Sequence, residues 1–504
     1  MARTDNSYRT ILRSSSIMGA ASVLNVLISL VRMKVVAVLL GPAGVGLIGL
    51  LGNLMQAASG VAAMGLGTVG VRQIADAHGN GRSEDVILAR RALLWGTVVL
   101  ALIGAATVYL LREPIARLVL ADPGKADAIG WLAIGVALTV ASGSQSALLN
   151  GLRRIGDLAK LQVATGLLST LLGIGALLLW GEAGLVAFVL SAPLATFLLG
   201  HYFVMRAGVI QAPPTPWRAI LAQWRVMIPL GAAFVVSGLV TTGGYLVVRS
   251  LVQRELGPDA LGQFQAAYAI GMTYLGVVLA AMGTDYYPRL CAALHDPAAA
   301  TRLVNEQTEV ALLLACPAVL ATLALSPWLV PLLYTHAFTP AIAILHWQLL
   351  GDLLKVMSWP LGFVIVAAGA GKTFAFSEIV GLAVFVAGVA VGLPLIDVLA
   401  TGVAFLAMYL VYLPVVWWLA RRRIGFAWTP VVVRMGLGFF AAACAVSALS
   451  AWSEIAAAIV GLTLAAASGL FALDRLGRAA GLTGRLGRVV GTGRALAMRM
   501  GVLR

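Results

Sequence analysis

One hydrophobic hairpin occurs twice in the chain, and this duplication constrains the fold more than any other feature. Each copy, at residues 19–65 and 231–283, consists of an apolar stretch, a turn and a second apolar stretch. Both turns read Leu-Gly-Pro and are followed by a further glycine, Gly46 in the first copy and Gly262 in the second. Gly and Pro interrupt helices for steric reasons, and duplicated halves recur in membrane transporters. The sequence therefore predicts two related halves that face each other across a pathway.

The composition places both halves in a membrane. The 504 residues are 61% hydrophobic and 11% charged, and the mean hydropathy is +0.96. Cys291, Cys316 and Cys444 lie in or beside apolar stretches without metal-ligand spacing, which indicates buried small side chains. A net charge of +15 would suggest nucleic acid for a soluble protein. Because the arginines here lie between apolar stretches, we expect membrane lipids and no nucleic acid as partners.

Fourteen stretches supply the roughly 20 apolar residues that a membrane-spanning helix needs. They predict an all-α polytopic membrane protein. The first stretch is too long for a secretory signal peptide and contains Arg32 and Lys34. The predicted spans are 14–39, 44–68, 92–111, 128–150, 161–180, 185–205, 226–248, 262–284, 307–330, 341–367, 377–395, 401–420, 431–451 and 455–475.

The distribution of basic residues predicts the orientation. If the N-terminus is cytoplasmic, 27 of the 35 Lys and Arg residues fall in cytoplasmic segments and 5 fall in external loops. Positive charge near membrane ends stays inside, so we expect both termini in the cytoplasm.

Six predicted spans separate the starts of the two hairpins, so both copies have the same orientation. This predicts parallel repeats, related by an axis along the membrane normal. The connection between them contains Pro213, Pro214 and Pro216, which disfavour a helix, and the glycine-rich C-terminal end favours a loosely ordered segment. The predicted parts are a six-helix bundle at 1–206, a cytoplasmic linker at 207–225, a second six-helix bundle at 226–423, two additional spans at 424–475 and a basic cytoplasmic tail at 476–504.

Polar residues follow one side of the first span. Ser22 and Ser29 lie seven residues apart, as do Asn25 and Arg32, so all four fall on one side of a helix. An ionisable group at the centre of a span costs at least about 2.5–3.5 kcal/mol and normally faces a cavity. We therefore expect Asn25 and Arg32 to line one. Lys34 points elsewhere and can extend to the membrane surface.

A second group of polar residues lies in the predicted span 341–367. Gln348, Asp352 and Lys355 are spaced four and three apart and share a helix face, where Asp352 can pair with Lys355. Two interpretations are open. The pair is a structural lock between helices, or it exchanges partners or protons as a cavity opens to either side.

Further charged candidates lie at the ends of spans. For Arg72 and Arg289, a phosphate-binding role and the general excess of cytoplasmic cations explain the position equally well. The others are Arg249, Asp285 and Glu378.

The sequence contains no convincing enzymatic motif. Residues 369–373 imitate the end of a phosphate-binding loop, but Val366 stands where the first glycine is required, and the segment lies between spans. The five histidines have no metal-ligand spacing, and no nucleophile motif is present. We expect no cofactor, no metal and no enzymatic activity.

Several of these motifs resemble lipid-linked oligosaccharide flippases of the Wzx type. That family includes the O-antigen and enterobacterial common antigen translocases, in the superfamily of multidrug exporters and peptidoglycan-precursor flippases. The resemblance covers residues 8–423. It is carried by the polar seam and Gly-Pro turn of the first hairpin and by the segments 287–290, 347–355, 377–379, 408–412 and 421–423. The chain departs from the common-antigen pattern by its last two spans, which the peptidoglycan-precursor flippases also have.

The resemblance implies a polyprenyl pyrophosphate carrying an oligosaccharide, moved from the inner to the outer leaflet of the bacterial cytoplasmic membrane by alternating access. It also implies a polysaccharide polymerase and a chain-length regulator as partners. Arg and Lys would offset the desolvation of the pyrophosphate, and either substrate supply or an ion gradient would bias the cycle. The substrate-binding candidates are Asn25, Arg32, Arg72, Arg249, Arg289, Gln348 and Lys355, and the ion-coupling candidates are Asp285, Asp352 and Glu378.

Two other functions compete with this one. A multidrug cation exporter of the same superfamily would share the architecture but favour acidic and aromatic cavity residues. A polysaccharide polymerase or glycosyltransferase would normally carry a large soluble loop, whereas the longest predicted external loop is 112–127. The cations of the predicted spans favour an anionic substrate.

Overall fold

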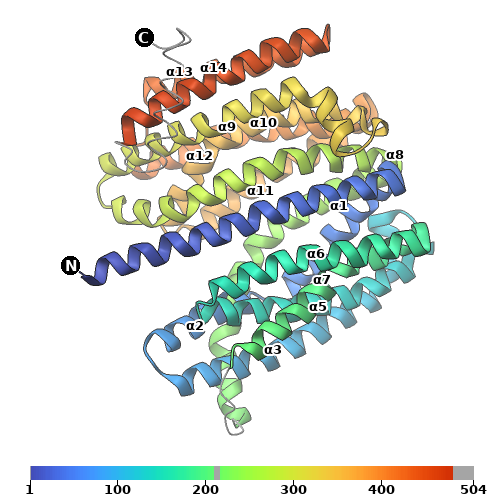
Figure 1. Ribbon diagram of the computed structural model, residues 1–504, viewed down its shortest axis with the longest axis vertical. Helices are drawn as coiled ribbons and strands as arrows, with labels where there is room; N and C mark the ends of the chain where they lie inside the picture. Colours follow the sequence, from blue (N-terminus) through green and yellow to red (C-terminus); the bar gives the residue numbers. More distant parts are fainter. Residues whose placement is uncertain (1, 209–215, 481–504) are drawn as a thin grey trace. The chain divides into compact units, whose positions relative to one another are not determined.

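Helices account for the regular secondary structure throughout the part of the chain that the structure describes. The computed structural model describes residues 2–208 and 216–480 (Figure 1). No strand occurs within these ranges, which confirms the prediction of an all-α protein. The predicted tail falls mostly outside them, as do the prolines Pro213 and Pro214 of the predicted linker.

Nine segments of the described chain are long and apolar enough to cross a membrane. Three of them, Met18–Ala62, Ile155–Arg206 and Gly371–Ile424, each cover most or all of two predicted spans, because neighbouring helices follow one another with little or no connection. The predicted spans 226–248 and 262–284 lie in one further helix, α8. The protein is therefore a multi-pass membrane protein.

Contacts divide the chain into two compact units, Met1–Gly262 and Gln263–Arg504. This division falls within α8 (Trp217–Ala293), whereas the predicted bundles meet at the linker 207–225. Compactness and internal repetition are different criteria, so the bundle boundaries stay a prediction. The helix α8 does begin at Trp217, directly after Pro216, and thus includes the second half of the predicted linker.

In the first unit, α5 is the central helix and packs against α1, α2, α3 and α7. The indole of Trp224 in α8 donates a hydrogen bond to the carbonyl of Ala92 in α3 at 2.8 Å, which holds the start of α8 against this bundle. The elements of this unit are α1 (Ala2–Ala62), α2 (Leu66–Gly79), α3 (Ser83–Leu110), α4 (Arg112–Ile115), η1 (Ala116–Leu120), η2 (Pro123–Lys125), α5 (Ala126–Gly151), α6 (Ile155–Trp180), η3 (Gly181–Gly184), α7 (Leu185–Arg206) and the first part of α8.

In the second unit, α12 packs closely on α10 and α11. Two glycines permit the approach of α10 and α12: a Cβ at Gly402 would lie 2.7 Å from the carbonyl oxygen of Ile344, and one at Gly351 would lie 2.7 Å from the ring of Phe405. The elements are the rest of α8, α9 (Pro297–Leu333), η4 (His336–Phe338), α10 (Pro340–Ala367), α11 (Gly371–Ile396), η5 (Asp397–Leu399), α12 (Ala400–Ile424), α13 (Pro430–Ser450) and α14 (Glu454–Ala480).

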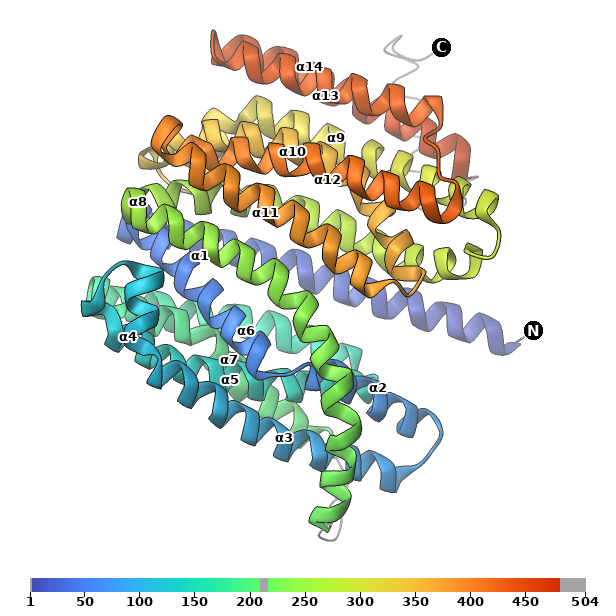
Figure 2. The same cartoon turned by 180° about the vertical axis from the view of Figure 1, so that it is seen from behind.

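The two Leu-Gly-Pro turns adopt the same backbone conformation. Gly41 in α1 has φ 61° and ψ −163°, and Gly257 in α8 has φ 82° and ψ −177°. Side chains disfavour positive φ, so glycine suits both positions. In α1 this kink separates two arms, and Figure 2 shows the second arm running back along the bundle. The matched conformations support the duplication predicted from the sequence.

The two turns also touch each other, through equivalent residues. A Cβ at Gly46 would lie 2.6 Å from both the carbonyl oxygen of Pro258 and the amide nitrogen of Gly262, and one at Gly262 would overlap the carbonyl of Pro42. The contact is reciprocal, because each glycine meets the proline of the other copy. All four residues belong to the first unit.

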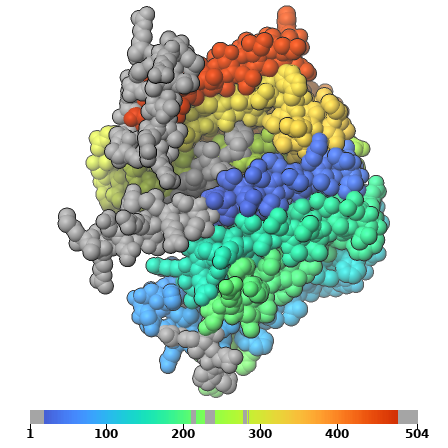
Figure 3. All heavy atoms as spheres, in the orientation of Figure 1, coloured from blue at the N-terminus to red at the C-terminus, as the bar shows by residue number. Residues whose placement is uncertain are grey.

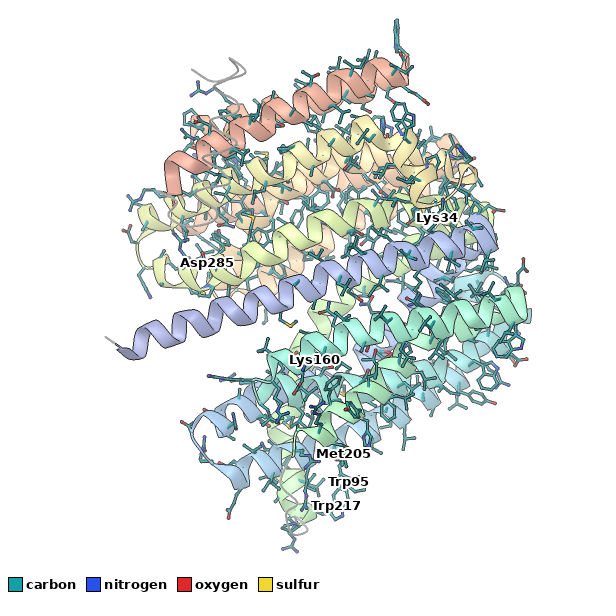
Figure 4. All side chains as sticks on the ribbon, in the orientation of Figure 1. Lys34, Trp95, Lys160, Met205, Trp217 and Asp285 are labelled. Atoms are coloured by element: carbon teal, nitrogen blue, oxygen red, sulfur yellow. The ribbon has the colours of Figure 1, made fainter. Side chains whose placement is uncertain are left out.

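The outer surface of the first unit is apolar, as expected for a surface in lipid. Large side chains such as Leu102 in α3 and Leu171 and Leu179 in α6 are strongly exposed, and α6 and α7 form much of the face of this unit in Figure 3. Trp95 and Trp217 lie together at one end, with ring centroids 5.1 Å apart (Figure 4). Such aromatic side chains are typical of the membrane–water interface.

Candidate functional site

The first arm of α1 carries Arg32, which is held among α6 and α7 by neutral groups. Its Nη1 donates to the hydroxyl of Ser169 at 3.3 Å. Its Nη2 donates to the carbonyl of Phe188 at 3.1 Å and to the hydroxyl of Ser191 at 3.2 Å. The guanidinium also lies 4.1 Å from the centre of the Phe188 ring, a favourable cation–π contact.

Arg32 borders a cavity of about 450 Å³ within the first unit. The cavity lies between the first arm of α1 and the helices α5, α6 and α7. None of the residues that line it in the described chain is an Asp or Glu. The charge of Arg32 thus faces a cavity whose described lining holds no acidic counter-ion, and a bound anion would offset its desolvation. The polar lining residues are Asn25, Ser29, Arg32, Ser146, Gln162, Thr165, Ser169, Thr170 and Thr196.

The polar seam predicted for the first span faces this cavity. Asn25, Ser29 and Arg32 all line it, and the Asn25 amide lies so close to Gly166 that a Cβ there would overlap its oxygen. Two further cations of these helices, Lys34 on α1 and Lys160 on α6 (Figure 4), are not among the lining residues.

The sequence analysis did not single out the opposite wall. Gln162, Thr165 and Ser169 on α6 follow helical spacing and face the seam. The sequence does contain this polar stripe within an apolar helix. Uncharged hydroxyl and amide groups, however, are a weaker indication of a cavity than an arginine is.

In the second unit, α10 carries a buried polar group. Gln348 and Asp352 are 2% and 1% exposed. Both polar atoms of the Gln348 amide are without a hydrogen-bond partner among the described residues. Asp352 points to α8, where a Cβ at Gly271 would lie 3.1 Å from its Oδ2. The absence of a side chain at Gly271 thus makes room for this carboxylate.

The Nζ of Lys355 donates to the sulfur of Met272 on α8 at 3.3 Å. A direct pair between Asp352 and Lys355 stays a prediction. The carboxylates of Asp352 and of Glu378 on α11 both attract its charge. Helical spacing indicated the shared face, but the neighbouring helices α8 and α11 determine where each side chain points.

Glu378 belongs to the same cluster. Its Oε1 accepts a hydrogen bond of 2.6 Å from the hydroxyl of Tyr412 on α12, and the rings of Tyr409 and Tyr412 meet edge to face with centroids 6.0 Å apart. A carboxyl group between a tyrosine hydroxyl and a lysine can exchange a proton and thereby change the charge of the cluster. We refer to Asp352, Lys355 and Glu378 as the charged cluster.

The remaining predicted residues lie outside both groups. Arg249 is 4% exposed and contacts its own helix, with Nη1 3.5 Å from the carbonyl of Tyr245. Arg72 is exposed on α2. Asp285 and Arg289 form an exposed ion pair of 3.1 Å at the end of α8; Figure 4 labels Asp285 there. Their roles in transport stay predictions.

A buried histidine connects α13, the first of the two helices that follow the second predicted bundle, to α9 and α10. The Nε2 of His346 on α10 lies 2.7 Å from the hydroxyl of Ser326 on α9, and its Nδ1 lies 3.1 Å from that of Ser447 on α13. Arg475 on α14 forms an ion pair of 2.7 Å with Glu309 on α9. The sequence analysis found no role for the histidines, because a lone His in an apolar helix carries no spacing signal.

Solved structures identify the class of fold. An inward-facing multidrug resistance MATE family transporter of the MOP superfamily matches with a TM-score of 0.68 and 17% identity, over 80% of this chain and 94% of that one. The lipid II flippase MurJ, in an inward closed conformation, matches with a TM-score of 0.67 and 12% identity, over 92% of this chain and all of that one. The chain thus has the fold of the MOP superfamily transporters.

Sequence comparisons identify the family within that class. The chain belongs to the polysaccharide biosynthesis protein family, whose model matches residues 11–293. It is 23% identical over 400 residues to the lipid III flippases of Escherichia coli K12 and Shigella flexneri, a match that covers 77% of this chain and 94% of each relative. The resemblance predicted from the sequence motifs is confirmed.

Proposed function

We propose that this protein is a flippase that moves a polyprenyl-pyrophosphate-linked oligosaccharide from the cytoplasmic to the periplasmic leaflet of the bacterial inner membrane. The family match and the lipid III flippase relatives support a lipid-linked oligosaccharide as substrate. The observation that carries the proposal is Arg32, a cation in a cavity whose described lining holds no acidic side chain. The proposed substrates are O-antigen precursors or the lipid-linked units of related surface polysaccharides.

The chemistry of the Arg32 cavity suits a pyrophosphate. A guanidinium presents donors in a planar fork that matches phosphate oxygens. The three neutral acceptors around Arg32 position the fork without neutralising its charge. Asn25 and Gln162 supply amides in the same space for the polar part of the substrate, while the lipid tail stays in the bilayer.

The same cavity argues against an organic cation as substrate. A cationic drug would need a carboxylate or an aromatic face to offset its charge, and the described lining of this cavity contains neither an acid nor an aromatic residue. The likeness to the MATE transporter concerns the fold, which can host different functions.

The charged cluster is the proposed site of energy coupling. One elementary charge that crosses 100 mV releases about 2.3 kcal/mol, so a few protons suffice to bias the cycle. Protonation of Glu378 or Asp352 would weaken the electrostatic attraction of that carboxyl group for Lys355. Lys355 could then change partners during the proposed alternating-access movement of the two halves. Gln348, Arg72, Arg249, Asp285 and Arg289 are further proposed contacts of the substrate or of the ion.

The proposal includes a topology and partners. Both termini lie in the cytoplasm, as the distribution of Lys and Arg indicates. The flipped lipid would be handed to a polysaccharide polymerase and a chain-length regulator. The protein itself is proposed to act as a transporter, without enzymatic activity or cofactor.

The test is the flipping of a fluorescent polyprenyl-pyrophosphoryl oligosaccharide in proteoliposomes. We expect Arg32→Ala to lower the initial rate at least about tenfold, since a charged hydrogen bond contributes about 1.5–3 kcal/mol. Arg117→Ala is the matched control, because Arg117 is exposed and lies outside the cavity. Export of cationic dyes in place of lipid flipping would contradict the proposal, as would an Arg32→Ala variant as fast as the control.

A further inference from the structure

A second cavity of about 270 Å³ lies in the first unit, apart from the Arg32 cavity. It is enclosed by the second arm of α1, the start of α2, and parts of α3 and α5, helices that Figure 2 shows from the back of the molecule. The break between α1 and α2, where Met64 and Gly65 have φ 44° and 64°, lies at its edge. A water molecule takes about 30 Å³ in the liquid, so this space can hold a group of many atoms.

Three glycines keep this cavity open without allowing helices to pack closely. A Cβ at Gly60 or Gly143 would meet no atom within 4 Å, and one at Gly67 would find only the carbonyl of Gly143, at 3.9 Å. Glycine inside a helix costs about 0.5–1 kcal/mol relative to alanine, and in membrane helices it usually permits close helix contact. Here no neighbour occupies the space, which points to room for a ligand.

A buried hydroxyl group faces the same cavity. Ser59 on α1 is 4% exposed, and its Oγ has no hydrogen-bond partner among the described residues. Across the cavity, Thr139 and Ser144 on α5 donate to carbonyls of their own helix at 2.7 and 2.9 Å, so their lone pairs stay available. An unsatisfied buried hydroxyl costs about 1–3 kcal/mol, which a ligand that both donates and accepts would recover.

The lining defines the chemistry of that ligand. It contains no charged side chain; its polar members in the described chain are hydroxyls and the amide of Gln56. A lining without charged side chains favours a neutral ligand over an ion. Leu66, Leu100 and Val140 supply apolar contact beside the hydroxyls. Neutral donors and acceptors beside apolar carbon match a sugar ring.

We propose that this cavity binds a sugar residue of the transported oligosaccharide and is the part of the protein that selects the glycan. The inference rests on the proposed flippase function, with the pyrophosphate at Arg32. Helix α5 borders both cavities, through Ser144 in the sugar cavity and Ser146 in the Arg32 cavity. One lipid-linked oligosaccharide thus finds a charged subsite and a neutral subsite on the same unit.

The test measures binding in detergent with two lipids: polyprenyl pyrophosphate alone and the same lipid carrying three N-acetylglucosamine residues. We expect wild type to bind the sugar-bearing lipid at least tenfold more tightly. The Cβ of a residue at Gly143 or Gly60 would meet no atom within 4 Å, so Gly143→Leu and Gly60→Leu place a side chain in the cavity. Both should make the two affinities equal, with the affinity for the sugar-free lipid unchanged. Gly175→Leu is the matched control, because Gly175 on α6 also has open space and lines neither cavity.

Ser59→Ala gives a finer test, because it removes one hydroxyl and changes the volume little. A neutral hydrogen bond contributes about 1 kcal/mol, so the preference for the sugar-bearing lipid should fall about fivefold. Equal affinities in wild type, or a preference that survives both Leu substitutions, would overturn the inference. Flipping of the two lipids by wild type is measured separately: lipids that bind with the expected preference but do not cross would refute the flippase and leave the sugar subsite standing.

Discussion

The two units treat buried charge in different ways. In the first unit, neutral oxygens hold Arg32, and it borders a cavity of about 450 Å³ whose described lining contains no acid. In the second unit, Lys355 lies near the carboxylates of Asp352 and Glu378. A cation without a counter-ion beside open space is suited to attract an anion, whereas one cation beside two carboxylates is suited to change the charge of its cluster by one proton. With the proposed function, this comparison leads us to expect substrate binding mainly in the first unit and ion coupling mainly in the second.

The largest expected effect is on stability, and it separates the two cations. Lys355→Met removes the cation that attracts Glu378 and Asp352, and loss of one partner from a buried charge group costs about 3–5 kcal/mol. Arg32→Met leaves no buried carboxylate among the described residues without its cation. Ser169 and Ser191 also keep hydrogen bonds, because both already donate to helix carbonyls. Thermal unfolding in detergent should therefore show a much lower melting temperature for Lys355→Met only. The double variant Lys355→Met/Glu378→Gln should regain part of the lost melting temperature. Equal decreases in melting temperature for Lys355→Met and Arg32→Met would contradict the proposed difference between the two units.

A carboxylate introduced beside Arg32 by substitution should make the first unit resemble the second. Ser169→Asp places a carboxylate next to the Nη1 of Arg32, which now lies 3.3 Å from the serine hydroxyl. Flipping of the anionic lipid should fall about 10- to 100-fold, the equivalent of one charged hydrogen bond, while the melting temperature does not fall. Ser169→Asn is the control of similar size, and the idea is refuted when both variants transport equally well.

Removal of the proton-accepting group should affect coupling more than transport itself. Glu378→Gln keeps a hydrogen-bond acceptor for Tyr412 but cannot change its charge. In proteoliposomes we expect the stimulation by an imposed pH gradient, up to about tenfold per coupled charge at modest potentials, to disappear while flipping without a gradient persists. Tyr412→Phe keeps the carboxylate and should retain stimulation. A full response to the gradient in Glu378→Gln would exclude this residue from coupling.

The smallest effect is expected for an exposed pair. Asp285 and Arg289 form an ion pair with side chains 74% and 57% exposed, and such pairs contribute at most about 1 kcal/mol. Asp285→Asn should therefore leave the melting temperature nearly unchanged, and high salt should remove any difference that remains. A loss comparable to that of Lys355→Met would show that exposure is a poor guide to the role of charge in this protein.

Features that repeat along one chain segment could be predicted from the sequence. The Leu-Gly-Pro motifs predicted the turns that the structure shows as matched kinks at Gly41 and Gly257. Helical spacing predicted that Asn25 and Arg32 share one cavity wall. Contacts between segments could not be predicted in the same way. The spacing placed Asp352 and Lys355 on one helix face, but it could not show that Met272, more than eighty residues away in the sequence, contacts the lysine.

The same limit explains the residues that the sequence analysis missed. His346 becomes meaningful only when α9 and α13 bring Ser326 and Ser447 to its two nitrogens. The sugar cavity depends on glycines whose importance lies in what is absent beside them, and a sequence cannot show empty space. Single charges in apolar helices are visible without a structure, whereas neutral polar groups on different helices are not.

The reciprocal contact between the two turns has a consequence for how such a chain can arise. When Gly46 meets Pro258 and Gly262 meets Pro42, each copy presents the same surface to the other, as in an isologous dimer. In two identical unlinked hairpins, one substitution at this glycine would introduce two obstructing side chains at once. Fusion into a single chain removes that double penalty, because each glycine can then mutate alone. Backbone-to-backbone contact at both turns nevertheless leaves no room for a side chain at either position, so the single chain still requires glycine at both.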